Sequence, residues 1–180
     1  MKRRILSLVM VLFMMLSTIP SMSVMVSAAT EGYYTFTVSG GRVTITGFDK
    51  SVSGDIKIPN TIGGCPVIAV RNGAFSECSA LTSIEIPDSV TTIGDGAFSY
   101  CSALTSIEIP DSVTTIGNSA FSNCSALTSI EIPDSVTSIG GYAFHNCYID
   151  FISFRFPVII IYISASGGFG NIVIMYRCSG

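Results

Sequence analysis

The sequence predicts a right-handed solenoid that is rich in β-structure, has short helical turns and begins with a β-hairpin cap. Two observations predict this fold class. A segment of 23 residues recurs almost unchanged at 73–95, 96–118 and 119–141, and a fourth copy begins at Tyr142. Each copy carries more apolar side chains than it can bury by itself, so the copies must stack to form a common core.

Each copy contains one short segment with the pattern of a half-buried strand. In the first copy, Leu81, Ile84 and Ile86 form an L-x-x-I-x-I core. Such a core is typical of leucine-rich repeats, whose periods are about 20–29 residues. Residues two apart on a strand share a face, so Ile84 and Ile86 are expected to point inward and Glu85 outward. Pro87 has no N–H to donate and is expected to end the strand.

The remainder of each copy is expected to return the chain to the next strand. Val90 and Ile93 are apolar and are expected to point back into the core, with Gly94 permitting the bend that follows. The coil then closes through a predicted short helical turn, whose buried side chains are those of Ala97, Phe98 and Cys101.

Upstream of the regular copies, residues 29–55 are expected to form a cap over the first turn of the solenoid. Two alternating apolar runs, 34–38 and 43–45, flank a Gly-rich turn at 39–41. Strands of this kind around such a turn predict a β-hairpin. The solenoid itself is predicted to start at residue 56.

Downstream, the repeat pattern continues less regularly as far as Pro157. Phe151, Phe154 and Phe156 preserve the L-x-x-L-x-L pattern with aromatic residues, one position late. The predicted solenoid therefore covers residues 56–157. The apolar tail at 158–180 is interpreted either as a cap over the open end, which solenoids require, or as the end of a truncated array.

The first 28 residues are interpreted as a secretory signal peptide. Lys2, Arg3 and Arg4 precede a short apolar run, and the small residues before Ala28 offer a cleavage site after it. The run is too short to cross roughly 30 Å of hydrocarbon, so no stable membrane span is expected after cleavage. Export predicts a secreted or cell-surface protein. Losing the three basic residues takes the formal net charge from −3 to −6.

The six cysteines offer either buried thiols or disulfides. Four of them recur at one place in successive copies, which favours an inward column of small apolar groups beside the phenylalanines. Export permits disulfides, and strand spacing would allow bridges between neighbouring turns, so both alternatives stay open. The sequence has no C-x-x-C pair, which disfavours zinc. The column comprises Cys78, Cys101, Cys124 and Cys147, with Cys65 and Cys178 outside it.

The outward side of the predicted strands carries a repeated acidic pattern, which we interpret as the binding face. A serine and a glutamate recur in every full copy, and a basic residue occupies the corresponding position at each end. Carboxylates could also serve calcium binding or glycoside hydrolysis. Repeat-related carboxylates share nearly one environment, however, whereas acid–base catalysis needs two different pKa values. The predicted face comprises Lys57, Ser83, Glu85, Ser106, Glu108, Ser129, Glu131 and Arg155.

Composition argues against several other function classes. A hydrophobic fraction of 48 % with a mean hydropathy of +0.61 is too apolar for a disordered chain. The negative net charge disfavours a nucleic-acid partner. The single histidine, His145, cannot build a multi-histidine metal site or favour a histidine-dependent catalytic triad. We expect no enzyme activity, no metal and no cofactor.

The consensus A-F-x-x-C-x-x-L-x-x-I-x-I-P-x-x-V-x-x-I-G resembles the BspA-type leucine-rich repeat of bacterial surface proteins, over roughly residues 56–157. The resemblance implies a secreted or surface-attached binding protein, since some members of that family adhere to host matrix proteins or to other cells. We therefore expect an adhesion module that engages a protein or glycan partner through its strand face. The alternative is a structural spacer, or a truncated fragment of a larger cell-surface repeat protein.

Overall fold

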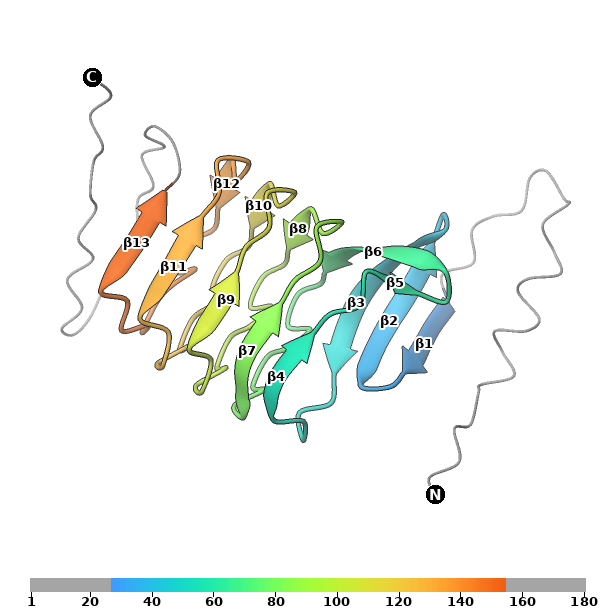
Figure 1. Cartoon of the computed structure of the whole chain (residues 1–180), viewed down its shortest axis with the longest axis horizontal. Coiled ribbons are helices and arrows are strands. Elements are labelled where there is room, and N and C mark those ends of the chain that lie inside the picture. Colours follow the sequence, from blue (N-terminus) through green and yellow to red (C-terminus); the bar gives the residue numbers. More distant parts are fainter. Residues whose placement is uncertain (1–26, 155–180) are drawn as a thin grey trace, which may run out of the picture.

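The computed structural model describes residues 27–154, which form one coiled array of short strands (Figure 1). These residues contain no helix, and thus none that could cross a membrane. Each regular turn of the coil, called a rung below, has a longer strand on one side and a two-residue strand on the other. The strands are β1 Ser27–Glu31, β2 Tyr34–Ser39, β3 Arg42–Phe48, β4 Gly54–Lys57, β5 Thr61–Ile62, β6 Cys65–Val70, β7 Leu81–Glu85, β8 Thr92–Ile93, β9 Ser106–Glu108, β10 Thr115–Ile116, β11 Ser129–Ile132, β12 Ser138–Ile139 and β13 Phe151–Phe154.

Two stacks of parallel strands form the walls of the coil. One stack runs through β6, β8, β10 and β12, and it continues at the N-terminal end into β3, β2 and β1. The other stack contains β4, β7 and β9 in one ladder and β11 with β13 in a second. The apolar side chains lie between the two walls, which confirms the predicted solenoid.

The core confirms the inward positions that the repeat predicts. In the second copy Leu104, Ile107 and Ile109 are each at most 8 % exposed, whereas Glu108 between them is exposed. The phenylalanines of successive rungs stack face to face, with ring centroids 5.2, 5.4 and 5.5 Å apart from Phe75 to Phe144. Burying one large side chain stabilises a fold by about 1.5–3 kcal/mol. Stacking of rungs is therefore the main source of stability.

The predicted helical turn is wrong, because the segment at 96–101 forms hydrogen bonds between rungs instead of a helix. The N–H groups of Phe98 and Tyr100 donate to carbonyls of the following rung at 2.8 Å. The alternate N–H groups, those of Ala97, Ser99 and Cys101, bond locally to carbonyls three residues back. Gly96 and Tyr100 have φ values of 58° and 61°. These left-handed residues interrupt any helix, for which every residue must be right-handed.

The repeated glycine after the second strand has a different role from the predicted one. A Cβ on Gly117 would lie 2.5 Å from the backbone nitrogen of Asp95 in the preceding rung. A Cβ does not come that close to backbone atoms in real structures. This position must therefore lack a side chain if the two rungs are to keep their observed spacing. Its φ is not positive. Close approach, and not a bend, therefore requires glycine here.

The N-terminal hairpin is confirmed, and it is larger than predicted. β2 and β3 pair antiparallel around the turn at 39–41, and β1 adds a strand that the sequence did not indicate. Phe36, Val43 and Ile45 are buried in the core, and the ring centroids of Phe48 and Phe75 are 4.9 Å apart. The hairpin thus covers the first rung. The predicted cleavage after Ala28 falls within β1, and the rest of the predicted signal peptide lies outside the described residues.

The predicted register of the last strand is wrong by two residues. β13 pairs with β11 so that Ile152 lies opposite Ile130 and Ser153 opposite Glu131. Ile152 is 6 % exposed, as an inward strand residue should be. Ile149 takes the place that leucine has in the full copies and packs against the core. It follows Cys147 by two residues, whereas Leu127 follows Cys124 by three. Arg155, Cys178 and the tail at 158–180 lie outside the described residues.

Candidate interaction surface

The N-terminal part of the predicted binding face is a parallel ladder with its polar residues in register. β4, β7 and β9 place Lys57, Glu85 and Glu108 side by side, and the same ladder pairs Ser83 with Ser106. The three charged side chains are exposed, while the isoleucines that flank Glu85 and Glu108 along their strands are buried. We call this solvent side of β4, β7, β9 and β11 the strand face.

The basic end of the strand face contacts its acidic neighbour directly. Lys57 forms an ion pair with Glu85, and more than half of each side chain is exposed. Exposed pairs of this kind contribute little stability, about 0–1 kcal/mol. Glu85 and Glu108 stand on adjacent strands, whose spacing is about 4.8 Å. Their mutual repulsion is of order 0.9 kcal/mol in water and less in salt.

The strand face is interrupted where a continuous ladder was expected. β9 and β11 lie side by side (Figure 1), but the described strands form no ladder between them. Ser129 and Glu131 are exposed on β11, as predicted, and pair with β13 instead. Ser153 stands opposite Glu131, at the place in the column that was predicted for Arg155, and Arg155 itself lies outside the described residues.

Sequence reasoning missed a second polar column on the strand face. The hydroxyl of Thr82 donates to Asp55 Oδ1 at 2.7 Å, and the hydroxyl of Thr105 donates to the backbone carbonyl of Thr82 at 3.0 Å. Thr128 occupies the same place in the third copy and is exposed. The recurrence of threonine directly after the first leucine of each copy was the available signal. The face therefore presents hydroxyls beside its carboxylates.

The repeat cysteines are free and form the predicted inward column. The thiols of Cys101, Cys124 and Cys147 each donate to the carbonyl of a phenylalanine one rung earlier, at 2.9–3.1 Å. Burial raises the pKa of Cys78 to about 11 and that of Cys101 to about 12. Such thiols are protonated at neutral pH and therefore poor nucleophiles. Within residues 27–154 no histidine, cysteine or carboxylate cluster could hold a metal.

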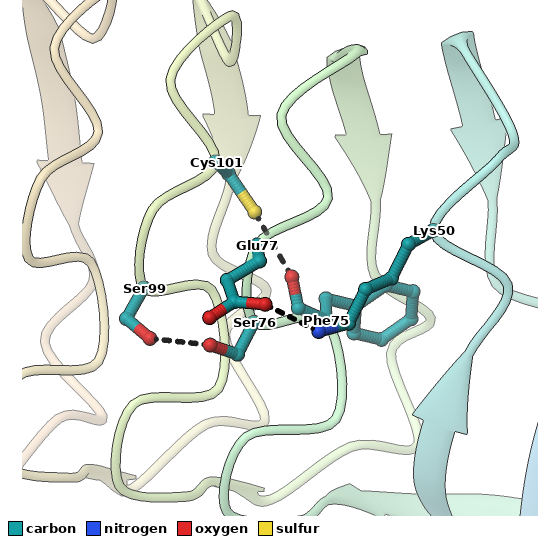
Figure 2. Close-up of polar contacts among 6 residues, drawn as sticks. All are labelled: Lys50, Phe75, Ser76, Glu77, Ser99 and Cys101. Carbon is teal, nitrogen blue, oxygen red and sulfur yellow. Dashed lines mark hydrogen bonds and ion pairs between the residues drawn. The ribbon is translucent and has the colours of Figure 1, made fainter.

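A second surface lies where each rung turns between its two strands. This turn edge comprises residues 73–77, 96–100, 119–123 and 142–146. Figure 2 shows its first two rungs, where the Ser76 and Ser99 hydroxyls hydrogen-bond at 2.9 Å and Lys50 forms an ion pair with Glu77 at 2.6 Å. His145 replaces these serines in the last rung, where its ring lies 5.7 Å from that of Tyr142.

The architecture and its 23-residue rungs correspond to a known repeat. The family model described as "BspA type Leucine rich repeat region (6 copies)" matches residues 46–167. The chain belongs to this family. The match begins ten residues before the predicted solenoid and ends ten residues after it. No curated protein matches the chain.

Solved structures of bacterial leucine-rich repeat proteins share the fold. A leucine-rich repeat protein from Bacteroides capillosus is 32 % identical with a TM-score of 0.65, and the match covers 72 % of this chain and 99 % of that one. The T. pallidum leucine-rich repeat protein is 27 % identical with a TM-score of 0.55, covering 68 % of each chain. A leucine-rich cell surface protein from Faecalibacterium prausnitzii is 28 % identical with a TM-score of 0.56, covering 68 % of this chain and 38 % of that one.

These relatives place the chain in a functional class without naming a ligand. Leucine-rich repeats typically serve as protein-interaction modules, and the similar proteins are named as repeat proteins and not as enzymes. One of them is named a cell surface protein, although the chain spans little more than a third of its length. The cell surface is accordingly the compartment to which the family points.

Proposed function

We propose that this protein is an exported, non-enzymatic binding module whose strand face engages a protein partner at a cell surface or in the extracellular matrix. The observation that carries the proposal is the in-register ladder of Lys57, Glu85 and Glu108 with its neighbouring hydroxyls. A ladder held by backbone hydrogen bonds presents these groups rigidly, so a partner orders few side chains on binding. Repeated carboxylates also attract basic partners over a distance.

The strand face supports binding better than catalysis. Its carboxylates are exposed to solvent, and Glu85 and Glu108 stand at equivalent backbone positions on adjacent strands. Acid–base catalysis instead depends on groups whose surroundings drive their pKa values apart. Recognition through a repeated pattern needs no such asymmetry.

A binding assay on the purified chain tests the proposal. A variant with Glu85→Gln, Glu108→Gln and Glu131→Gln keeps the shape of the face and removes its charge. We expect this variant to lose at least tenfold in affinity for an immobilised matrix protein that the wild type binds, at low and at moderate salt. The control replaces Asp88, Asp111 and Asp134 by Asn, which removes equal charge outside the strands. Undiminished binding by the glutamine variant would exclude the strand face as the recognition surface.

A structural spacer is the second candidate, and the near identity of the copies favours it. The segment L-T-S-I-E-I is the same in all three full copies, as recent duplication of a harmless surface would leave it. A spacer predicts that wild type and both variants fail equally to bind any protein of a broad extracellular panel.

A further inference from the structure

We propose that the turn edge is a second interaction surface, which binds a protein segment through uncharged tyrosine and asparagine side chains. It goes beyond the strand face in both location and chemistry. The residues concerned are the outer positions of the turn-edge segments from the second rung onward: Tyr100, Ser119, Asn123, Tyr142 and Asn146.

The turn edge is where the copies differ. Its segments read G-A-F-S-E, G-A-F-S-Y, S-A-F-S-N and Y-A-F-H-N, so the inner Ala-Phe pair is constant and both outer positions vary. The first two full copies differ only at Glu77/Tyr100 and Asp95/Asn118, and the second pair directly precedes the turn edge. Variation from rung to rung gives each rung of the turn edge its own contacts, so a partner can distinguish one rung from the next.

The varying residues occupy backbone positions that suit glycine best. Both outer positions of every segment are left-handed, with φ from 52° to 67°, and glycine stands there only at Gly73 and Gly96. Left-handed backbone costs an L-residue with a Cβ roughly 1–2 kcal/mol, although asparagine tolerates it better. Tyr100 and Tyr142 adopt it while 56 % and 50 % exposed. Two exposed tyrosines thus stand where folding alone would favour glycine, and such strain gathers at functional positions.

The chemistry of the edge fits a protein partner. The carboxylate of Glu77 is paired with Lys50 at 2.6 Å, and the outer positions beyond it carry no carboxylate or ammonium group. Interface cores are depleted of charge and enriched in tyrosine. Tyrosine with asparagine and serine is also the composition of antibody paratopes, where rigid rings supply area and amides supply adaptable hydrogen bonds.

The backbone of the edge is preorganised for such contacts. Tyr100 N donates to Ser122 O at 2.8 Å and Asn123 N donates to His145 O at 2.7 Å. Each of these bonds fixes the backbone of one outer residue to the next rung. Asn146 Nδ2 donates to Asn123 Oδ1 at 2.9 Å, which aligns the two amides. A partner therefore meets fixed groups, which lowers the entropic cost of binding.

Selection from a phage-displayed random-peptide library on the immobilised full chain tests the proposal. Enriched peptides are then titrated against three variants. Tyr100→Asn with Tyr142→Asn removes the rings and keeps residues that tolerate left-handed backbone. Tyr33→Asn removes a tyrosine that is also 56 % exposed but lies outside the turn edge. The third is the triple glutamate-to-glutamine variant of the strand face.

We expect the dominant peptides to bind the double tyrosine variant at least tenfold more weakly, and to bind the other two variants as they bind the wild type. Their affinity should change less than threefold between about 50 and 200 mM salt, because no charge pairs form. Peptides that depend on the three glutamates and on salt would overturn the turn edge while supporting the strand face. Failure to enrich any peptide would overturn it too, as would tyrosine-dependent binding to a glycan array alone.

Discussion

The strand face and the turn edge are built from the same repeats, yet duplication has treated them in opposite ways. On the strand face, Glu85 and Glu108 are direct neighbours in a ladder, so changing one alters the surroundings of the other. On the turn edge, backbone hydrogen bonds connect successive rungs at the outer positions, whichever side chain stands there. The comparison teaches that backbone hydrogen bonds can hold rungs together while the side chains at the same positions vary from copy to copy.

The largest expected effect comes from the core that supports both surfaces. Phe98→Ala beneath the turn edge should destabilise the protein by about 3–5 kcal/mol, and Leu104→Ala beneath the strand face by about 2–5 kcal/mol, because both side chains are fully buried. Urea unfolding followed by circular dichroism measures the two values. A cost near zero for either variant would contradict the inward assignment of that column.

A steric prediction separates the two kinds of glycine in each rung. Gly117→Ala should cost roughly 3 kcal/mol, because its Cβ would meet the backbone of the preceding rung, which cannot move aside alone. Gly96→Ala should cost only about 1–2 kcal/mol, since φ is 58° but the nearest atom is 3.4 Å away. Thermal unfolding of the pair checks the order. An equal cost for the two variants would contradict close approach as the reason for glycine at Gly117.

The buried thiols predict a loss of stability at alkaline pH. Burial raises the pKa of Cys101 to about 12 from its ordinary value of 9.0, so the unfolded chain releases this proton first. The contribution is complete below pH 9 and is lost as the pH rises toward 12, by at most about 1.4 kcal/mol per pH unit. The free energy of unfolding should therefore fall more steeply above pH 9 in the wild type than in Cys101→Ala. Parallel slopes for the two proteins would contradict a shielded thiol.

The smallest effect concerns the strained positions of the turn edge. Tyr100→Asn should stabilise the protein by roughly 0.5–1 kcal/mol, because asparagine adopts left-handed backbone at lower cost. The matched control is Tyr33→Asn, since Tyr33 is equally exposed but is not left-handed and should show no gain. Differential scanning calorimetry resolves the difference in Tm. If the variant is destabilised, the ring makes contacts that outweigh the strain.

Much of this architecture was predictable from periodicity because identical copies must occupy equivalent places. The inward leucine, isoleucine, phenylalanine and cysteine columns follow from spacing alone, and so does the exposure of Glu85. The inward position of Ile152 could not be predicted from spacing, because the nearby aromatic residues match the repeat pattern in a different register. Burial decides between the two registers, and burial depends on the shorter connection that lets Ile149 reach the core.

The sequence by itself determined the rung, its inward residues and the need to stack, since these depend on apolar spacing within one copy. The tertiary structure decided how neighbouring rungs bond. The break between β9 and β11, the alternation of local and inter-rung hydrogen bonds at 96–101, and the need for glycine at Gly117 are all relations between copies. A repeated sequence lists the same groups each time and cannot say which atoms of adjacent copies meet. Packing in three dimensions fixes those contacts, and with them the two surfaces that the protein presents.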